Sequence, residues 1–109
     1  MAETLDRAHL ALPTAAITDA SCVAYTATST CTAYVAISNV DGTNDVDIDI
    51  AVDVGGTGAV IRYVAGKNTP VPKRASFSPM TVVLLTGDKL RARASAAGDA
   101  ELYANIVKS

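Results

Sequence analysis

A strict two-residue alternation at residues 46–54 constrains the fold more than any other feature of this sequence. Apolar side chains alternate there with small or acidic ones, in the order Val46, Asp47, Ile48, Asp49, Ile50, Ala51, Val52, Asp53 and Val54. Because successive side chains of a strand point to opposite faces, the pattern predicts a strand with one buried face and one face in water. Glycines at 55, 56 and 58 predict a turn, and residues 59–65 a second strand that completes a hairpin.

Short segments of similar character continue along the chain. Strands are predicted at 22–27, 32–39, 73–77, 81–85, 89–95 and 100–107, the first two joined as a hairpin by a polar turn at 28–30. Pro70 and Pro72 exclude a central strand from the loop at 66–72. About eight short strands with turns between them predict an all-β antiparallel sandwich, jelly-roll or immunoglobulin-like, or a small barrel. Residues 1–20 lack this periodicity, so we expect an extended N-terminal arm, with a helical turn at 6–12 as an alternative, followed by one domain at 21–109.

Composition limits both the core and the partners. The chain of 109 residues has no Trp and one Phe, so its core is built from small aliphatic side chains that bury little area each. Burial against neighbouring subunits is therefore an expected source of stability. A net charge of -2 favours neither nucleic acid nor an anionic membrane. Residues 1–20 lack the basic start and apolar run of a signal peptide, which predicts synthesis in the cytoplasm without secretion by that route.

Residues that carry catalytic or metal chemistry are scarce. His9 is the single histidine, and it lies in the predicted arm, away from any rigid nucleophile. Two cysteines, Cys22 and Cys31, do not make a metal site by themselves. We expect them to be reduced, with a disulfide across the first predicted hairpin as the alternative. The sequence thus predicts no enzymatic activity, no cofactor and no metal.

The charges fall into one acidic and one basic sector. Asp41, Asp45, Asp47, Asp49 and Asp53 have no basic residue among them, whereas residues 62–93 contain Arg62, Lys67, Lys73, Arg74, Lys89, Arg91 and Arg93 against Asp88 alone. Alternate carboxylates on a strand lie about 6.5–7 Å apart, a spacing open to glycoside cleavage or calcium binding, but no aromatic sugar platform or calcium-loop pattern accompanies them. The acidic face is therefore expected to be solvated or set against a basic partner.

Two arrangements of these sectors remain open. In one, an acidic face meets the basic face of a neighbouring subunit in a symmetric oligomer. The interface residues are then Asp47, Asp49, Asp53, Lys73, Arg74, Arg91 and Arg93. Charge reversal at Arg91 and Arg93 is expected in that case to abolish assembly and leave the fold intact. In the other arrangement, the two sectors are adjacent strands that neutralise each other within one subunit.

The order of these segments resembles a group of small virion proteins of tailed bacteriophages. The resemblance covers about residues 20–108 and rests on Tyr25-Thr26, the strand ending at Asn39, the loop with Pro70 and Pro72, the turn Gly87-Asp88-Lys89-Leu90, and the small-residue turn before Tyr103. Many members have a Pro-Ala-Gly-Lys turn after the Tyr-Thr strand, where this chain has residues 27–31, Ala-Thr-Ser-Thr-Cys. The resemblance implies a β-sandwich without enzymatic activity and a place in the phage particle.

A bacteriophage virion structural protein is the function expected from these observations. A capsid decoration or cement protein is favoured, because an arm and two complementary faces suit the bridging of capsid subunits. A neck or tail ring, or a tail-fibre-associated role, is the alternative within this class. The expected partners are a second copy in a symmetric homo-oligomer and the major capsid protein or other virion proteins, with assembly in the host cytoplasm. A carbohydrate-binding attachment module is the alternative from another class.

Overall fold

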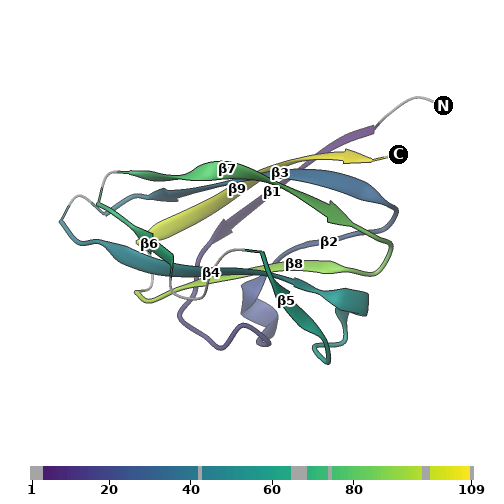
Figure 1. Ribbon diagram of the computed structural model, residues 1–109, viewed down its shortest axis with the longest axis horizontal. Helices are drawn as coiled ribbons and strands as arrows, with labels where there is room; N and C mark the ends of the chain where they lie inside the picture. The colour runs from purple at the N-terminus through teal and green to yellow at the C-terminus, as the bar shows by residue number, and fades with distance from the viewer. Residues whose placement is uncertain (1–3, 42, 65–68, 74, 97–98, 109) are drawn as a thin grey trace.

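The computed structural model describes residues 4–41, 43–64, 69–73, 75–96 and 99–108, which form two antiparallel sheets packed face to face (Figure 1). The strands are β1 (Thr4–Ala11), β2 (Val23–Thr26), β3 (Cys31–Asn39), β4 (Val46–Asp53), β5 (Ile61–Tyr63), β6 (Thr69–Val71), β7 (Ser76–Leu84), β8 (Lys89–Ala94) and β9 (Ala100–Lys108). Two short 3₁₀ turns, η1 (Ala20–Cys22) and η2 (Val54–Gly56), accompany them.

The strand order is that of a jelly roll. One sheet has the order β1-β9-β3-β7, and the other has the order β2-β8-β4-β5, with β6 pairing to the opposite half of β4. Consecutive strands thus alternate between the sheets from β1 to β4, and the chain returns in the same way from β7 to β9. The predicted all-β antiparallel sandwich is confirmed, and of the variants open from the sequence the jelly roll is the one observed.

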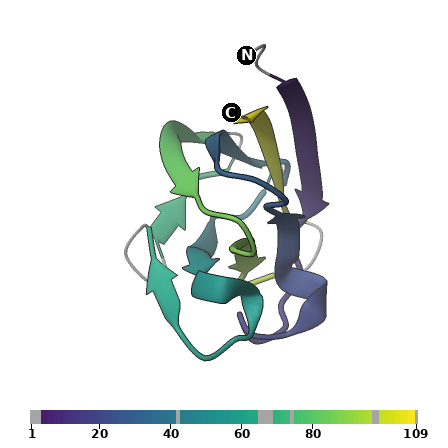
Figure 2. The same cartoon turned by 90° about the vertical axis from the view of Figure 1, so that its right-hand side faces the viewer.

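The core consists of the inward side chains of both sheets. Figure 2 shows the ribbon of the sandwich end-on. The largest fully buried members of the core are leucines and isoleucines, namely Leu12, Ile37, Ile48, Ile50, Leu84, Leu90, Leu102 and Ile106. Fully buried alanines on β3, β8 and β9 fill the space between them. The core is therefore continuous but made of small side chains, as the composition predicts.

Residues 4–11 form a strand of the sandwich, so the predicted extended arm at 1–20 needs correction. β1 pairs along its whole length with β9, from Thr4 opposite Lys108 to Ala11 opposite Glu101. Ala8 is buried and points into the core. The sequence pattern is weak because β1 is an edge strand that contributes few buried side chains. In a jelly roll this strand completes one sheet and is part of the domain.

The local pairing predictions had mixed outcomes. β4 and β5 form the predicted hairpin, with Ala51 opposite Tyr63. The predicted hairpin of 22–27 with 32–39 is wrong, because β2 pairs with β8 and β3 pairs with β7 and β9. The predicted strands at 73–77 and 81–85 overlap one continuous strand, β7 (Ser76–Leu84), whose register against β3 shifts between Val35 and Ile37. Within the predicted loop at 66–72, Thr69–Val71 forms the short edge strand β6.

Leu12, just after β1, provides a test of whether the N-terminal segment belongs to the domain. Its side chain is 1% exposed and lies in the core. Leu12→Ala is expected to lower the free energy of unfolding by about 2–5 kcal/mol, because it leaves a cavity among buried neighbours. Leu85→Ala, at a leucine that is 59% exposed, is the matched control and should change it by about 0.5 kcal/mol or less. Equal, small effects in urea denaturation would contradict the assignment.

Candidate functional site

The predicted charged residues meet on the outer face of the β2-β8-β4-β5 sheet. β4 and β8 are neighbours, with Asp49 opposite Arg93 and Ala51 opposite Arg91. The Arg91 Nε donates to Asp53 Oδ2 at 3.0 Å, and these two side chains are only 5% and 0% exposed. The second Asp53 oxygen accepts from the Gly58 backbone N–H at 2.9 Å. Asp53 and Arg91 thus form a buried ion pair with further hydrogen-bond partners within one chain.

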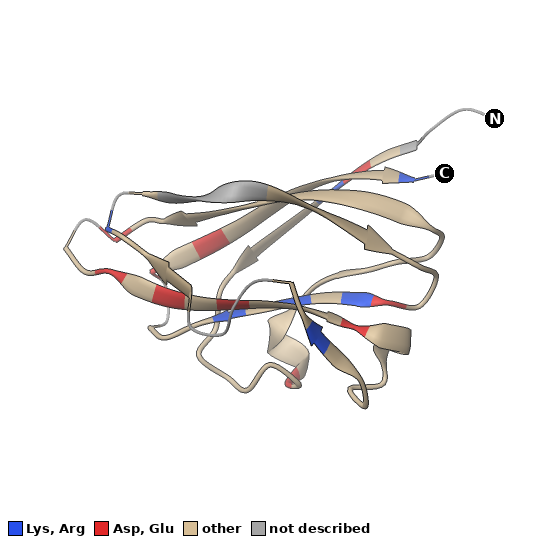
Figure 3. Cartoon of the chain, viewed as in Figure 1, with Lys and Arg blue, Asp and Glu red and all other residues tan. Residues whose placement is uncertain are grey.

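Arg93 and Asp49 form a second ion pair beside the first. The Arg93 Nη1 lies 3.2 Å from Asp49 Oδ2, and both side chains are largely covered. Figure 3 shows the charged positions lying along β4 and β8, whereas the described parts of the other sheet are mainly uncharged. Adjacent strands therefore neutralise each other at these four residues, which is the second of the two arrangements left open by the sequence.

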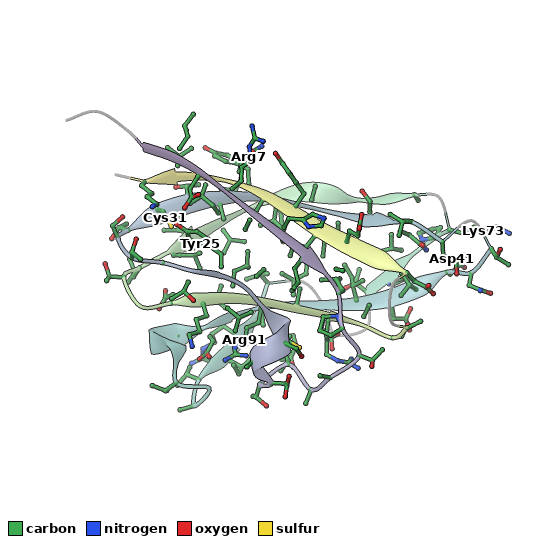
Figure 4. The ribbon with its side chains drawn as sticks, turned by 180° about the vertical axis from the view of Figure 1, so that it is seen from behind. Arg7, Tyr25, Cys31, Asp41, Lys73 and Arg91 are labelled. Carbon is green, nitrogen blue, oxygen red and sulfur yellow. The ribbon has the colours of Figure 1, made fainter. Side chains whose placement is uncertain are left out.

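Residues 12–22, here called the strap, cover this charged face. Backbone carbonyls of the strap accept hydrogen bonds from the guanidinium groups of Arg91 and Arg93. Arg91 Nη1 donates to the Asp19 carbonyl at 2.7 Å and to that of Ile17 at 3.3 Å. Arg93 donates to the carbonyls of Ala15 at 2.8 Å and Thr14 at 3.0 Å. Figure 4 shows Arg91 beside η1, at the end of the strap. The two arginines thus hold the strap through the backbone carbonyl groups of residues 14, 15, 17 and 19, which lie in no strand.

The end of the strap is closed by local contacts around η1. Asp19 accepts from the Ser21 backbone N–H at 2.9 Å and also from its hydroxyl group, and these hydrogen bonds lower the pKa of Asp19. Cys22 Sγ lies 3.2 Å from the Ala16 carbonyl oxygen. Burial raises the pKa of the Cys22 thiol, so the reactive thiolate is disfavoured. Cys31 lies in the other sheet, and both cysteines are free and buried.

The remaining predicted interface residues lie apart from this cluster. Asp47 is exposed at the start of β4, and its backbone N–H donates to Ser95 Oγ at 3.0 Å. Lys73 is exposed, and its backbone N–H donates to Asp45 Oδ1 at 2.9 Å. Arg74 lies outside the described residues. Of the seven predicted interface residues, the structure brings Asp49, Asp53, Arg91 and Arg93 together, and it uses them within the chain.

The outer face of the β1-β9-β3-β7 sheet has the opposite character, because no segment of the described chain crosses it (Figure 1). Its apolar and aromatic side chains are exposed, with Leu5 at 76%, Val83 at 62%, Tyr34 at 49% and Tyr103 at 42%. This surface was not predicted, because the sequence shows which residues share a strand face but not whether another segment covers that face. The alternation of exposed Tyr34 with buried Ala33 and Val35 was the available signal.

A polar cluster marks the end of the sandwich where β1 and β9 project. Asp6 Oδ2 lies 3.4 Å from Lys108 Nζ and accepts from the Tyr25 hydroxyl at 3.4 Å. The backbone N–H of Arg7 is the main cause of the lowered Asp6 pKa, and burial is the main cause of the raised Tyr25 pKa. A recess of about 480 Å³ lies beside the cluster, lined by Leu5, Asp6, Arg7, Asn105 and Ile106. The recess is open, and the Asp6 carboxylate at its side is paired with Lys108.

Among the described residues, no group of three His, Cys, Asp or Glu side chains is placed to hold a metal ion. His9 lies on the exposed sheet face with Nε2 at 3.9 Å from Glu101 Oε1. Within the same residues, no helix is long and apolar enough to cross a membrane.

Substitution of Arg91 tests the buried ion pair. Arg91→Met keeps the aliphatic stem but leaves Asp53 as a buried charge without its partner, so we expect a loss of about 3–5 kcal/mol in the free energy of unfolding. Arg62→Met, at an exposed arginine on β5, is the matched control and should change it by about 0.5 kcal/mol or less. Denaturant unfolding measures both. A fully stable Arg91→Met variant with altered assembly would instead support the interface role expected from the sequence.

Comparisons with known proteins show no family for this chain. No protein-family model matches the sequence, and no curated protein matches it. The structure of Eiger TNF from S. frugiperda is similar, with 20% sequence identity, a TM-score of 0.47, and coverage of 77% of this chain. The match covers 61% of the Eiger chain, so this chain spans about three fifths of that protein's length. No inference about function follows from a likeness of this degree.

Proposed function

We propose that this chain is a bacteriophage virion structural protein, with a capsid decoration or cement role as the most specific form. The observation that carries the proposal is the difference between the two faces of the sandwich. One outer face is closed by the strap and its ion pairs, while the other presents large exposed apolar side chains without a covering segment in the described chain. Such a surface suits a subunit that packs against other proteins.

The resemblance to small virion proteins of tailed phages supports the same class. Its turn Gly87-Asp88 has a structural role here, because the Asp88 carboxylate accepts from the backbone N–H groups of Leu85 at 3.0 Å and Gly55 at 2.9 Å. The side chain thus ties the β7–β8 turn to the β4–β5 turn. The proposed partners are further copies of this chain and the major capsid protein or other virion proteins. A neck or tail ring needs the same kind of contacts and is the nearest variant of this proposal.

A carbohydrate-binding attachment module is a second candidate, favoured by one specific observation. Tyr34 and Tyr103 are both exposed and lie on the neighbouring strands β3 and β9, two residues apart in register. Diagonal neighbours of this kind are about 7–8 Å apart, so two rings face solvent side by side. Exposed aromatic rings of this kind are the platforms that sugar sites use.

Mass spectrometry of purified tailed-phage particles from a strain carrying this gene tests the virion proposal. We expect peptides of this chain in particles purified by density gradient. Its copy number per particle should stand in a fixed ratio to that of the major capsid protein or of a tail-ring protein. Particles free of the chain would contradict the proposal. A glycan array probed with the recombinant protein and with Tyr103→Ala separates the second candidate: binding that the substitution removes would favour the attachment module.

A further inference from the structure

We propose that the uncovered face of the β1-β9-β3-β7 sheet binds a second copy of this chain, as a twofold-symmetric dimer packed face to face. The inference names the surface for the self-association in the proposed function. Only the biological setting of the dimer rests on that function, because the geometry of this sheet face is a property of the chain itself. Four of the seven charged residues expected to mediate assembly, namely Asp49, Asp53, Arg91 and Arg93, form ion pairs within the chain, which favours a different surface for self-association.

Strand register arranges the exposed side chains of this face in rows that run across the sheet. The first row contains Leu5, Val107, Thr32 and Val83, in the order of the strands. The second contains Arg7, Asn105, Tyr34 and Thr81. The third contains His9, Tyr103 and Ala36, and the fourth contains Ala11, Glu101 and Ser38. Each row therefore crosses the face from the β1 edge toward the β7 edge.

A twofold axis parallel to the strands, midway between β9 and β3, makes these rows complementary to themselves. It exchanges β1 with β7 and β9 with β3, and each row meets the same row of the second copy. Leu5, 76% exposed, then lies against Val83 of the second copy, which is 62% exposed. Tyr103 lies against the small Ala36. Leu5 and Val83 thus form an apolar contact, Tyr103 meets a small side chain and Tyr34 meets Asn105, and each contact occurs twice, as an isologous interface requires.

The charges on this face are compatible with the same axis. Arg7 falls opposite Thr81 of the second copy, and Glu101 falls opposite Ser38. Neither Arg7 nor Glu101 lies against the same residue of the second copy. A twofold axis through either residue would have brought two like charges together. Arg7 stands on the outermost strand β1. A position near the rim allows its guanidinium group to remain hydrated while the apolar rows are buried.

The size of the face meets what a stable dimer needs. Its four strands are eight or nine residues long. With about 4.8 Å between strands and about 3.3 Å per residue, the face measures roughly 19 by 28 Å and buries about 1,000 Å² over both copies, the lower limit for a specific interface. Two sheets of this kind pack about 10 Å apart with mean strand directions within about 30° of each other, a range that includes the parallel strands of this axis.

Paired charge substitutions at Leu5 and Val83 test the axis as well as the face. Within one chain these residues are three strands apart, about 14 Å, so they do not pair with each other. In the proposed dimer they are in contact. Leu5→Glu alone and Val83→Lys alone should each raise the dissociation constant of the dimer at least tenfold, because each buries an unpaired charge. Mixed in equal amounts, the two variants should form a heterodimer, in which Glu meets Lys at one contact and Leu meets Val at the other.

Sedimentation equilibrium from micromolar to millimolar concentration measures the mass, with circular dichroism melting to confirm that each variant is folded. The unmodified chain should approach twice its 11.2 kDa mass. Val60→Lys, at an exposed valine next to β5 of the other sheet, is the matched control and should dimerise normally. A mass of 11.2 kDa at all concentrations, or an oligomer that Val83→Lys leaves intact, would overturn the inference. An intact oligomer of that kind would still agree with a virion subunit, so the two proposals fail separately.

Discussion

The buried ion pair between Arg91 and Asp53 is the constraint on which the arrangement of this molecule depends. A charge removed from water is tolerated only when partners satisfy it from several sides. Asp53 has Arg91 and the Gly58 N–H, and Arg91 has in addition the carbonyls of Ile17 and Asp19. The pair therefore requires that the strap lie across the sheet, and the strap in turn excludes water from the pair. Loss of the ion pair would leave the strap without its hydrogen-bond donor Arg91, and loss of the strap would expose the ion pair to water.

This mutual requirement gives the sandwich two unlike faces. The strap covers the charged sheet and leaves β1 on the edge of the other sheet, whose outer surface carries exposed Leu5, Tyr34, Val83 and Tyr103. A thin core of alanines, leucines and isoleucines gives limited stability by itself. In the proposed dimer, burial of the uncovered face by a second subunit would add to that stability. The proposed structural role and the proposed dimer both follow from this division between an internally satisfied face and an open one.

The sequence predicted the strands better than their partners. The alternation at 46–54 predicted β4, the buried positions of Ile48 and Ile50, and the hairpin to β5. The same alternation predicted a wet face, yet Asp49 and Asp53 are buried. Alternation reports which residues share a face, and it does not report whether a distant segment covers that face. Strand β1 and the separation of β2 from β3 into different sheets were missed for the same reason, because both depend on pairings far apart in sequence.

Thiol labelling of Cys22, with Cys31 as an internal reference, tests most directly whether the arginines hold the strap in place. Both thiols are buried, but only Cys22 belongs to the strap, with its Sγ beside the Ala15 and Ala16 carbonyl oxygens. Arg93→Met removes the hydrogen bonds to Thr14 and Ala15, each contributing about 1 kcal/mol, so Cys22 labelling should accelerate by roughly thirtyfold. Cys31 should keep its rate, as peptide mass spectrometry would show. Unchanged Cys22 labelling, or equal acceleration at both thiols, would contradict the account.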